Sequence, residues 1–284
     1  MNGGSTMLFE ENLFNETIEC RPAAIPTVNE EINIFSHGDR IFGRVLVPKA
    51  KNENDRFPAV VFLHGYPGTE ANLDIVHAFR RAGVCAVHFY YRGVWGSHGY
   101  YKFSHLYEDA ECVLDHLREN ADQLKIDPDR IYIIGYSMGG FCAMNLLARD
   151  AKVKGAVLLS PCDLGSRYIN KPARYQVTID AQKGGYFNIP NDTYLDEDVK
   201  AHAEQWQFPV LADQIDPKMP IRFVGGSEDV TTPTAIHIFP AMEVMKSRGM
   251  DVTYEEIPDS HEYAGHRILL TKTLFRKIIE LEQL

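Results

Sequence analysis

The chain has 284 residues, of which 45% are hydrophobic and 24% are charged, and it is long enough to bury a full core. Its formal net charge is −10 and no run of lysine or arginine is present, so we expect neither nucleic acid nor an anionic membrane surface as a partner. No apolar run reaches the roughly 18 residues that a transmembrane helix needs, which excludes a membrane span.

The N-terminal residues and the cysteines both bear on the cellular location. The first twenty residues contain neither a basic stretch nor an apolar stretch of the kind found in secretory signals. The five cysteines are scattered, odd in number and without a C-x-x-C pair, so they predict neither a disulfide framework nor a zinc site. These features predict a cytoplasmic protein. The sequence does not set the oligomeric state, and a homodimer is one arrangement open to it.

Hydrophobic periodicity predicts an α/β fold. Segments 31–36 and 40–47 alternate apolar and polar residues around a glycine-containing turn, which predicts a β-hairpin. Further strands are expected at 59–65, 85–91, 130–137, 155–161, 221–226 and 252–258, and helices at 70–82, 105–121, 138–148, 233–248 and 268–281. Strands that alternate with helices predict one mostly parallel eight-stranded sheet, with the first two strands antiparallel and helices on both faces.

This alternation stops between residues 163 and 218. No linker and no internal repeat divides the chain, so we expect residues 1–284 to form a single domain. The interruption lies between the sixth and seventh expected strands, at the edge of the sheet where ligands bind in such folds. It therefore predicts a small cap inserted into the domain.

A serine stands where the expected strand 130–137 meets the expected helix 138–148, in Gly135-Tyr136-Ser137-Met138-Gly139. A strand that turns into a helix within one residue imposes strained dihedral angles on the residue at the tip, and the crowded junction favours glycine two positions away on each side. Gly135 and Gly139 meet that requirement. The motif therefore predicts that the Ser137 hydroxyl stands above the sheet at the positive end of a helix.

A serine hydroxyl becomes a good nucleophile only when a base accepts its proton and a third group orients that base. The other strand ends supply candidates, because the carboxyl ends of parallel strands meet at one edge of the sheet. Asp229, beside Glu228, follows strand 221–226, and His261 follows strand 252–258. The order serine, acid, histidine along the chain is that of α/β-hydrolases.

Over nearly its whole length the chain resembles the α/β-hydrolase superfamily, most of all the serine esterase and prolyl-oligopeptidase-like branch that includes cinnamoyl and feruloyl carboxylesterases. The residues that carry the resemblance are His64-Gly65-Tyr66-Pro67-Gly68, Arg92-Gly93-Val94-Trp95-Gly96-Ser97, Gly135 to Gly139, Gly226-Ser227-Glu228-Asp229 and Ser260-His261. The resemblance implies Ser137 as nucleophile, Asp229 as acid and His261 as base. It also implies an oxyanion hole made by the backbone N–H groups of Tyr66 and Met138, and chemistry that needs no cofactor or metal.

Several alternatives stay open at this point. Glu228 could replace Asp229 as the acid, and His237 and His266 compete with His261 as the base, whereas His64 is expected to support its loop structurally. The histidines of the segment HEYAGH, 261–266, are five residues apart. On a helix that spacing rotates the second about 140° from the first, which excludes a shared metal on one helix face.

The expected activity is hydrolysis of a small-molecule carboxylic ester with a short-chain or aromatic, cinnamoyl-like acyl group. Aromatic residues of the cap and of the loop at 92–99 are predicted to bind this substrate, namely Trp95, Tyr168, Tyr186, Phe187 and Trp206. A small peptidase or amidase, or a thioesterase, would use the same residues. A non-catalytic binding module on the same fold is a further alternative, although such proteins usually lack one member of the triad and none is missing here.

Overall fold

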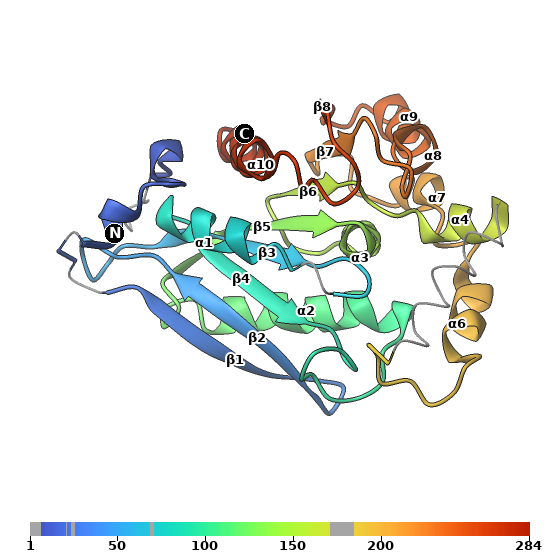
Figure 1. Cartoon of the computed structure of the whole chain (residues 1–284), viewed down its shortest axis with the longest axis horizontal. Helices are drawn as coiled ribbons and strands as arrows, with labels where there is room; N and C mark the ends of the chain where they lie inside the picture. Colours follow the sequence, from blue (N-terminus) through green and yellow to red (C-terminus); the bar gives the residue numbers. More distant parts are fainter. Residues whose placement is uncertain (1–6, 21, 24–25, 69–70, 171–184) are drawn as a thin grey trace.

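The computed structural model describes residues 7–20, 22–23, 26–68, 71–170 and 185–284. Its centre is an eight-stranded sheet in the order β1-β2-β4-β3-β5-β6-β7-β8 (Figure 1). The strands are β1 (Val28–Ser36), β2 (Asp39–Val47), β3 (Phe57–Leu63), β4 (Cys85–Tyr90), β5 (Ile126–Tyr136), β6 (Gly155–Leu159), β7 (Ile221–Gly226) and β8 (Val252–Ile257). β2 runs antiparallel to both of its neighbours and the remaining pairs are parallel, which confirms the predicted mostly parallel sheet.

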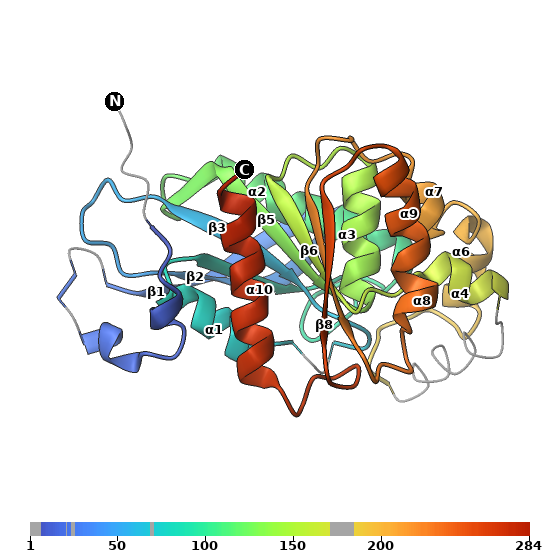
Figure 2. The same cartoon turned by 90° about the horizontal axis from the view of Figure 1, so that it is seen from above.

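Helices cover both faces of the sheet, as predicted (Figure 2). The described helices outside the predicted cap are α1 (Leu73–Arg81), α2 (Phe103–Glu119), α3 (Met138–Ala148), α8 (Thr234–His237), α9 (Phe239–Ser247) and α10 (Arg267–Glu282). In the described residues before β1 there are two short 3₁₀ turns, Glu10–Asn12 and Glu16–Cys20. One apolar core lies between the sheet and α2, α3 and α9, and a second lies between the sheet and α1 and α10. β3 and β6 are buried along their entire length, as strands covered on both faces must be.

The predicted helix 233–248 is wrong in one respect, because the structure divides it into α8 and α9 at Ile238. Pro240 explains the break. Its ring removes one backbone N–H and clashes with the carbonyl four residues earlier, so it is tolerated only in the first turn of a new helix.

Three helices connect β6 to β7 in the described part of the predicted cap. They are α4 (Leu164–Asn170), α6 (Tyr194–His202) and α7 (Phe208–Ala212), and they lie beyond the carboxyl ends of β5 and β6 (Figure 1). α6 packs against α2, and α7 packs against α3 and α9. Residues 171–184, which also belong to the predicted cap, lie outside the described residues. Within the described ranges, no helix is long and apolar enough to span a membrane.

Candidate active site

The junction of β5 and α3 is a tight, strained turn with Ser137 at its tip. Ser137 has φ of 53° and ψ of −114°, a positive φ that residues with a side chain rarely adopt. A Cβ atom on Gly135 would lie 2.5 Å from the carbonyl oxygen of Gly139, and one on Gly139 would lie 1.9 Å from the carbonyl oxygen of Leu63. Glycine is therefore required at both positions, for the steric reason that the sequence motif indicates.

We expect Gly139→Ala to destabilise the fold by about 3 kcal/mol or more, because the methyl group collides with the backbone of β3 and neither element can retreat. Gly38→Ala is the matched control, since Gly38 has φ of 90° and open space around its Cβ position. It should cost only about 1 kcal/mol, the price of the positive φ alone. Thermal unfolding of both variants measures the difference, and equal losses would contradict the steric account.

The three residues predicted to form a triad lie in one chain of hydrogen bonds. Nε2 of His261 is 2.9 Å from Oγ of Ser137, and Nδ1 of His261 is 2.8 Å from Oδ2 of Asp229. All three side chains are buried to more than nine-tenths. These distances allow a proton to pass from Ser137 to Nε2 while the carboxylate holds the N–H of Nδ1.

The loop after β7 holds Asp229 by several donors besides His261. The backbone N–H groups of Thr231 and Thr232 both donate to Oδ1, at 2.9 and 2.8 Å, and the Thr232 hydroxyl lies 2.9 Å from Oδ2. Burial alone raises the pKa of Asp229, but the hydrogen bond and charge of His261, with the N–H of Thr232 and the Ser160 side chain, hold that pKa well below its ordinary value. The carboxylate is therefore ionised at neutral pH.

Two further residues beneath Asp229 were missed by the sequence analysis. Ser160 follows β6 with φ of 40°, and Tyr263 lies in the histidine loop with φ of 52°. Their hydroxyl groups are 2.7 Å apart, and Ser160 also hydrogen-bonds the Asp229 carboxylate. Backbone strain of this kind concentrates at functional sites. No spacing or motif in the sequence marks these two residues, because their contact joins positions 103 residues apart.

We expect Thr232→Val to lower kcat about tenfold or more with little change in KM, because it removes a hydroxyl hydrogen bond to a buried carboxylate while keeping the side-chain shape. Thr232→Ser should restore most of the rate. Thr231→Val is the matched control, since Thr231 holds Asp229 through its backbone N–H alone. A loss in Thr231→Val as large as in Thr232→Val would mean that the hydroxyl has no special role.

The structure also separates the three residues that competed for roles in the triad. Glu228 is exposed, and its backbone N–H donates to Asp259. His266 lies 3.0 Å from the Asp259 carboxylate, and His237 accepts from the N–H of Asp163. The hydrogen bonds of His261 instead bring Asp229 and His261 together with the serine.

The two residues predicted to form an oxyanion hole with their backbone N–H groups, Tyr66 and Met138, belong to segments that lie next to Ser137. Met138 is the first residue of α3, where N–H groups have no acceptor within the helix. The loop that carries Tyr66 passes against the serine, since a Cβ on Gly65 would lie 3.2 Å from Cβ of Ser137. His64 supports this loop, with Nδ1 2.8 Å from the Gly65 carbonyl oxygen, and burial lowers its pKa to about 4, so the imidazole is neutral.

The family assignment follows from a sequence comparison. The sequence model of the alpha/beta hydrolase family matches residues 60–270, a range that contains Ser137, Asp229 and His261. The chain belongs to the alpha/beta hydrolase family. No curated protein matches its sequence at a significant level.

Solved structures share the fold of this hydrolase at low sequence identity. Est1E from Butyrivibrio proteoclasticus with ferulic acid bound is 20% identical, with 89% of this chain and 100% of that chain covered and a TM-score of 0.66. The Pyrococcus furiosus esterase Pf2001 is 18% identical, with 91% and 98% covered and a TM-score of 0.62. The Pyrococcus horikoshii acylaminoacyl peptidase is 16% identical with a TM-score of 0.64, but only 41% of that chain is covered. These likenesses confirm the predicted fold.

Three of the predicted substrate-binding residues gather beside the loop of Tyr66 in this hydrolase. The ring of Phe187 stacks on that of Tyr66 with centroids 4.8 Å apart, and it is itself 8% exposed at the margin of the core. Trp95 and Tyr186 are 45% and 43% exposed, with ring centroids 6.2 Å apart, and the Trp95 indole N–H donates to the Pro67 carbonyl. The structure thus places an aromatic wall, defined here as Tyr66, Trp95, Tyr186 and Phe187, next to the predicted oxyanion hole.

The prediction that Trp206 binds substrate is wrong. Its side chain is 2% exposed and packs edge-on against Phe141 of α3, so it belongs to the core that fixes the cap helices to the sheet layer. Tyr168 on α4 is partly buried against the same core. Its role toward substrate stays a prediction.

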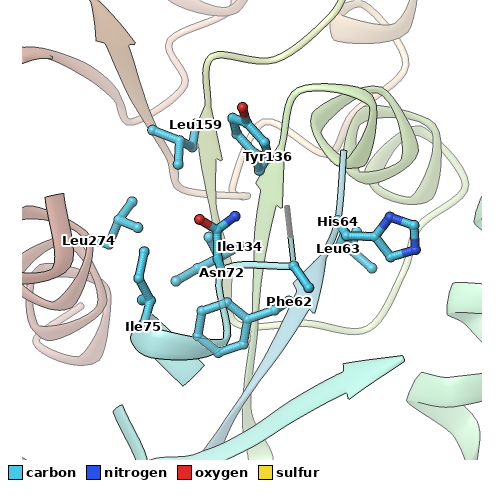
Figure 3. A pocket seen from close by; sticks show the side chains of 10 residues that line it. Phe62, Leu63, His64, Asn72, Ile75, Ile134, Tyr136, Leu159 and Leu274 are labelled. Atoms are coloured by element: carbon cyan, nitrogen blue, oxygen red, sulfur yellow. The ribbon is translucent and has the colours of Figure 1, made fainter. Parts of the chain in front are cut away.

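A small apolar cavity lies behind the active site, on the α1 and α10 side of the sheet (Figure 3). It is lined by Phe62, Leu63, His64, Ala71, Asn72, Ile75, Ile134, Tyr136, Leu159 and Leu274. Its volume of about 10 Å³ has room for about one water molecule. None of the triad residues lines this cavity, so it is not a substrate pocket.

Metal chemistry has no candidate site among the described residues, since no group of three or more His, Cys, Asp or Glu side chains is arranged to hold an ion. The two histidines of the segment HEYAGH make separate contacts: His261 hydrogen-bonds Ser137 and Asp229, and His266 hydrogen-bonds Asp259.

Proposed function

We propose that this hydrolase cleaves carboxylic esters of small molecules through a covalent acyl-enzyme, with Ser137 as nucleophile, His261 as general base and acid, and Asp229 as the residue that orients the imidazole. The observation that carries the proposal is the continuous pair of short contacts, 2.9 Å from Ser137 to His261 and 2.8 Å from His261 to Asp229. A hydroxyl, an imidazole and an ionised carboxylate in that order form the arrangement that activates a serine.

In the proposed reaction, Oγ of Ser137 attacks the ester carbonyl carbon while Nε2 of His261 accepts the hydroxyl proton. The tetrahedral intermediate collapses, the bond to the alcohol oxygen breaks, and Nε2 returns the proton to the departing alcohol. Water then attacks the acyl-enzyme by the same route and releases the acid. Asp229 stays ionised throughout and stabilises the imidazolium that forms in each half of the reaction.

The charge that develops on the carbonyl oxygen needs donors already in place. The backbone N–H groups of Tyr66 and Met138 are proposed to supply them, because Met138 directly follows the serine and the loop that carries Tyr66 passes next to it. In the part of the chain that the structure describes, the N–H of Tyr66 has no backbone acceptor. Removing one such donor typically costs on the order of 100- to 1000-fold in rate.

The aromatic wall supports a preference for compact or aromatic acyl groups. Flat rings beside the predicted oxyanion hole offer apolar contact and stacking to a planar substrate. The similar structure of Est1E holds ferulic acid, an aromatic acid, which agrees with this preference. We also propose a cytoplasmic location, because all five cysteines are free thiols.

A panel of p-nitrophenyl esters of graded acyl length, with methyl cinnamates and peptide anilides, tests the proposal. We expect kcat/KM to be highest for acyl groups of roughly two to six carbons or for cinnamates, and lower by about tenfold or more for long chains and anilides. Specificity constants that climb steadily beyond about eight carbons would contradict the acyl preference. Anilides that outpace every ester would favour the peptidase alternative, and a thioester arm tests the thioesterase.

A further inference from the structure

Arg167 on α4 is a half-buried guanidinium beside the proposed triad that no carboxylate neutralises within the described ranges. Its Nη1 donates to the carbonyl oxygen of Thr231 at 3.3 Å and lies 3.9 Å from the thiol of Cys162. Its Nε is buried and has no hydrogen-bond partner among the described residues. One neutral oxygen and one thiol are weak compensation for a charge that is partly removed from water.

Other arginines of the chain show what such a group normally contacts. The nearly buried guanidinium of Arg222 lies 2.7 Å from Oδ2 of Asp251, and that of Arg92 bonds both Glu108 and Asp109. Both of those guanidinium groups are neutralised by carboxylates, although Nε of Arg222 is, like that of Arg167, buried without a hydrogen-bond partner among the described residues. Arg167 has donors left over, in a planar fork that suits the two oxygens of a carboxylate.

The position of Arg167 connects it to the reaction. The N–H of Cys162 donates to the carbonyl oxygen of Ser137 at 2.9 Å, and the N–H of Thr231 donates to Asp229 at 2.9 Å. Both contacts of the guanidinium are thus made by residues that directly touch the nucleophile or the acid. The guanidinium therefore lies against the segments that follow β6 and β7, and it is carried by the cap helix α4, which lies beyond the carboxyl ends of the strands (Figure 1).

We propose that Arg167 binds a carboxylate carried by the substrate, so that this hydrolase acts on esters that are themselves anions. This inference rests on the proposed ester hydrolysis and names its substrate class. The net charge of −10 disfavours the approach of anions in general, so selective binding of an anionic ester requires a local cation such as this one. The carboxylate could stand on the acyl side or on the alcohol side of the ester.

Matched pairs of esters distinguish the two sides. The acyl arm compares monomethyl glutarate with methyl valerate, and the alcohol arm compares 4-acetoxybenzoate with phenyl acetate, each followed by acid release in a pH-stat. We expect wild-type kcat/KM to favour the anionic member in one arm. Arg167→Gln should lower that anionic-to-neutral ratio about 10- to 100-fold, which is the range of a charged hydrogen bond. Arg167→Lys should lower it less.

Arg149→Gln is the control, because Arg149 also has no carboxylate partner among the described residues. Its guanidinium lies over the ring of Tyr107, 4.1 Å from the ring centroid, at the end of α3 that is remote from Ser137. It should leave the ratio unchanged. If the wild type favours the neutral ester in both arms, or if Arg167→Gln slows both members equally, Arg167 is a structural link between α4 and the acid loop and the inference is overturned. Ser137-dependent turnover of the neutral esters would then leave the proposed function intact.

A binding measurement tests the inference without turnover. Calorimetric titration of the Ser137→Ala variant with monomethyl glutarate and with 4-acetoxybenzoate should detect binding of one of them, and that binding should weaken at least about tenfold when Arg167→Gln is added. Absence of binding for both anions, or equal binding with and without Arg167, would overturn the inference whatever the esterase assays give.

Discussion

Ser137→Ala is expected to lower kcat on every ester substrate by about 10⁴-fold or more, because no other group takes over covalent catalysis when the nucleophile of a triad is removed. Only one oxygen atom is lost, and the positive φ of 53° is retained by alanine at the same strained turn. The melting temperature should therefore stay within a few degrees of the wild type. Steady-state kinetics and thermal unfolding together measure the two expectations.

Ser227→Ala is the matched control, since Ser227 is an exposed serine at another strand end, after β7. It should leave both rate and stability unchanged. A serine-directed organophosphate should label Ser137 alone, and mass-spectrometric peptide mapping would show it. Turnover of Ser137→Ala within tenfold of the wild type would remove Ser137 from the mechanism.

The sequence predicted the features that depend on local pattern and steric demand. Alternating apolar runs predicted the strands, and glycines two positions on either side of Ser137 predicted the tight turn, because both are requirements that neighbouring residues impose on each other. The break at Pro240 could have been predicted in the same way, since proline inside a helical pattern is a local signal.

Features that depend on contacts between distant segments could not be predicted. The pairing of Ser160 with Tyr263, and the positive φ of both, are fixed by how the loops after β6 and β8 pack together around Asp229. The role of Trp206 was predicted wrongly for a related reason. An aromatic residue in a cap segment can face either the core or the substrate, and only the packing against Phe141 decides.

The acid loop shows how folding and the proposed catalysis depend on the same contacts. Asp229 is held by two backbone N–H groups, the hydroxyl of Thr232 and His261, so its side chain has little freedom to rotate. Since its folded-state pKa is depressed, its charge stabilises the fold above the ordinary carboxyl range, near pH 3.9, and this stabilisation is lost as the pH falls through the depressed value.

Asp229→Asn is the second substitution with a large expected effect, a loss of kcat on the order of 10⁴-fold with a small change in KM. The amide is neutral and cannot stabilise an imidazolium. If its NH₂ group faces Nδ1 of His261, it also favours the tautomer whose Nε2 carries the proton and cannot accept one from Ser137.

The control for this substitution is built into the sequence, because Glu228 is the adjacent carboxylate and is exposed. Glu228→Gln removes the same charge one residue away and should leave kcat within about twofold of the wild type. Both variants should be measured from pH 6 to 9. The loss in Asp229→Asn should persist across this range, because Asp229 is ionised throughout it in the wild type and the amide is neutral at every pH. A mild effect of Asp229→Asn with a severe effect of Glu228→Gln would move the acid to Glu228 and would require the loop after β7 to turn away from the geometry described here.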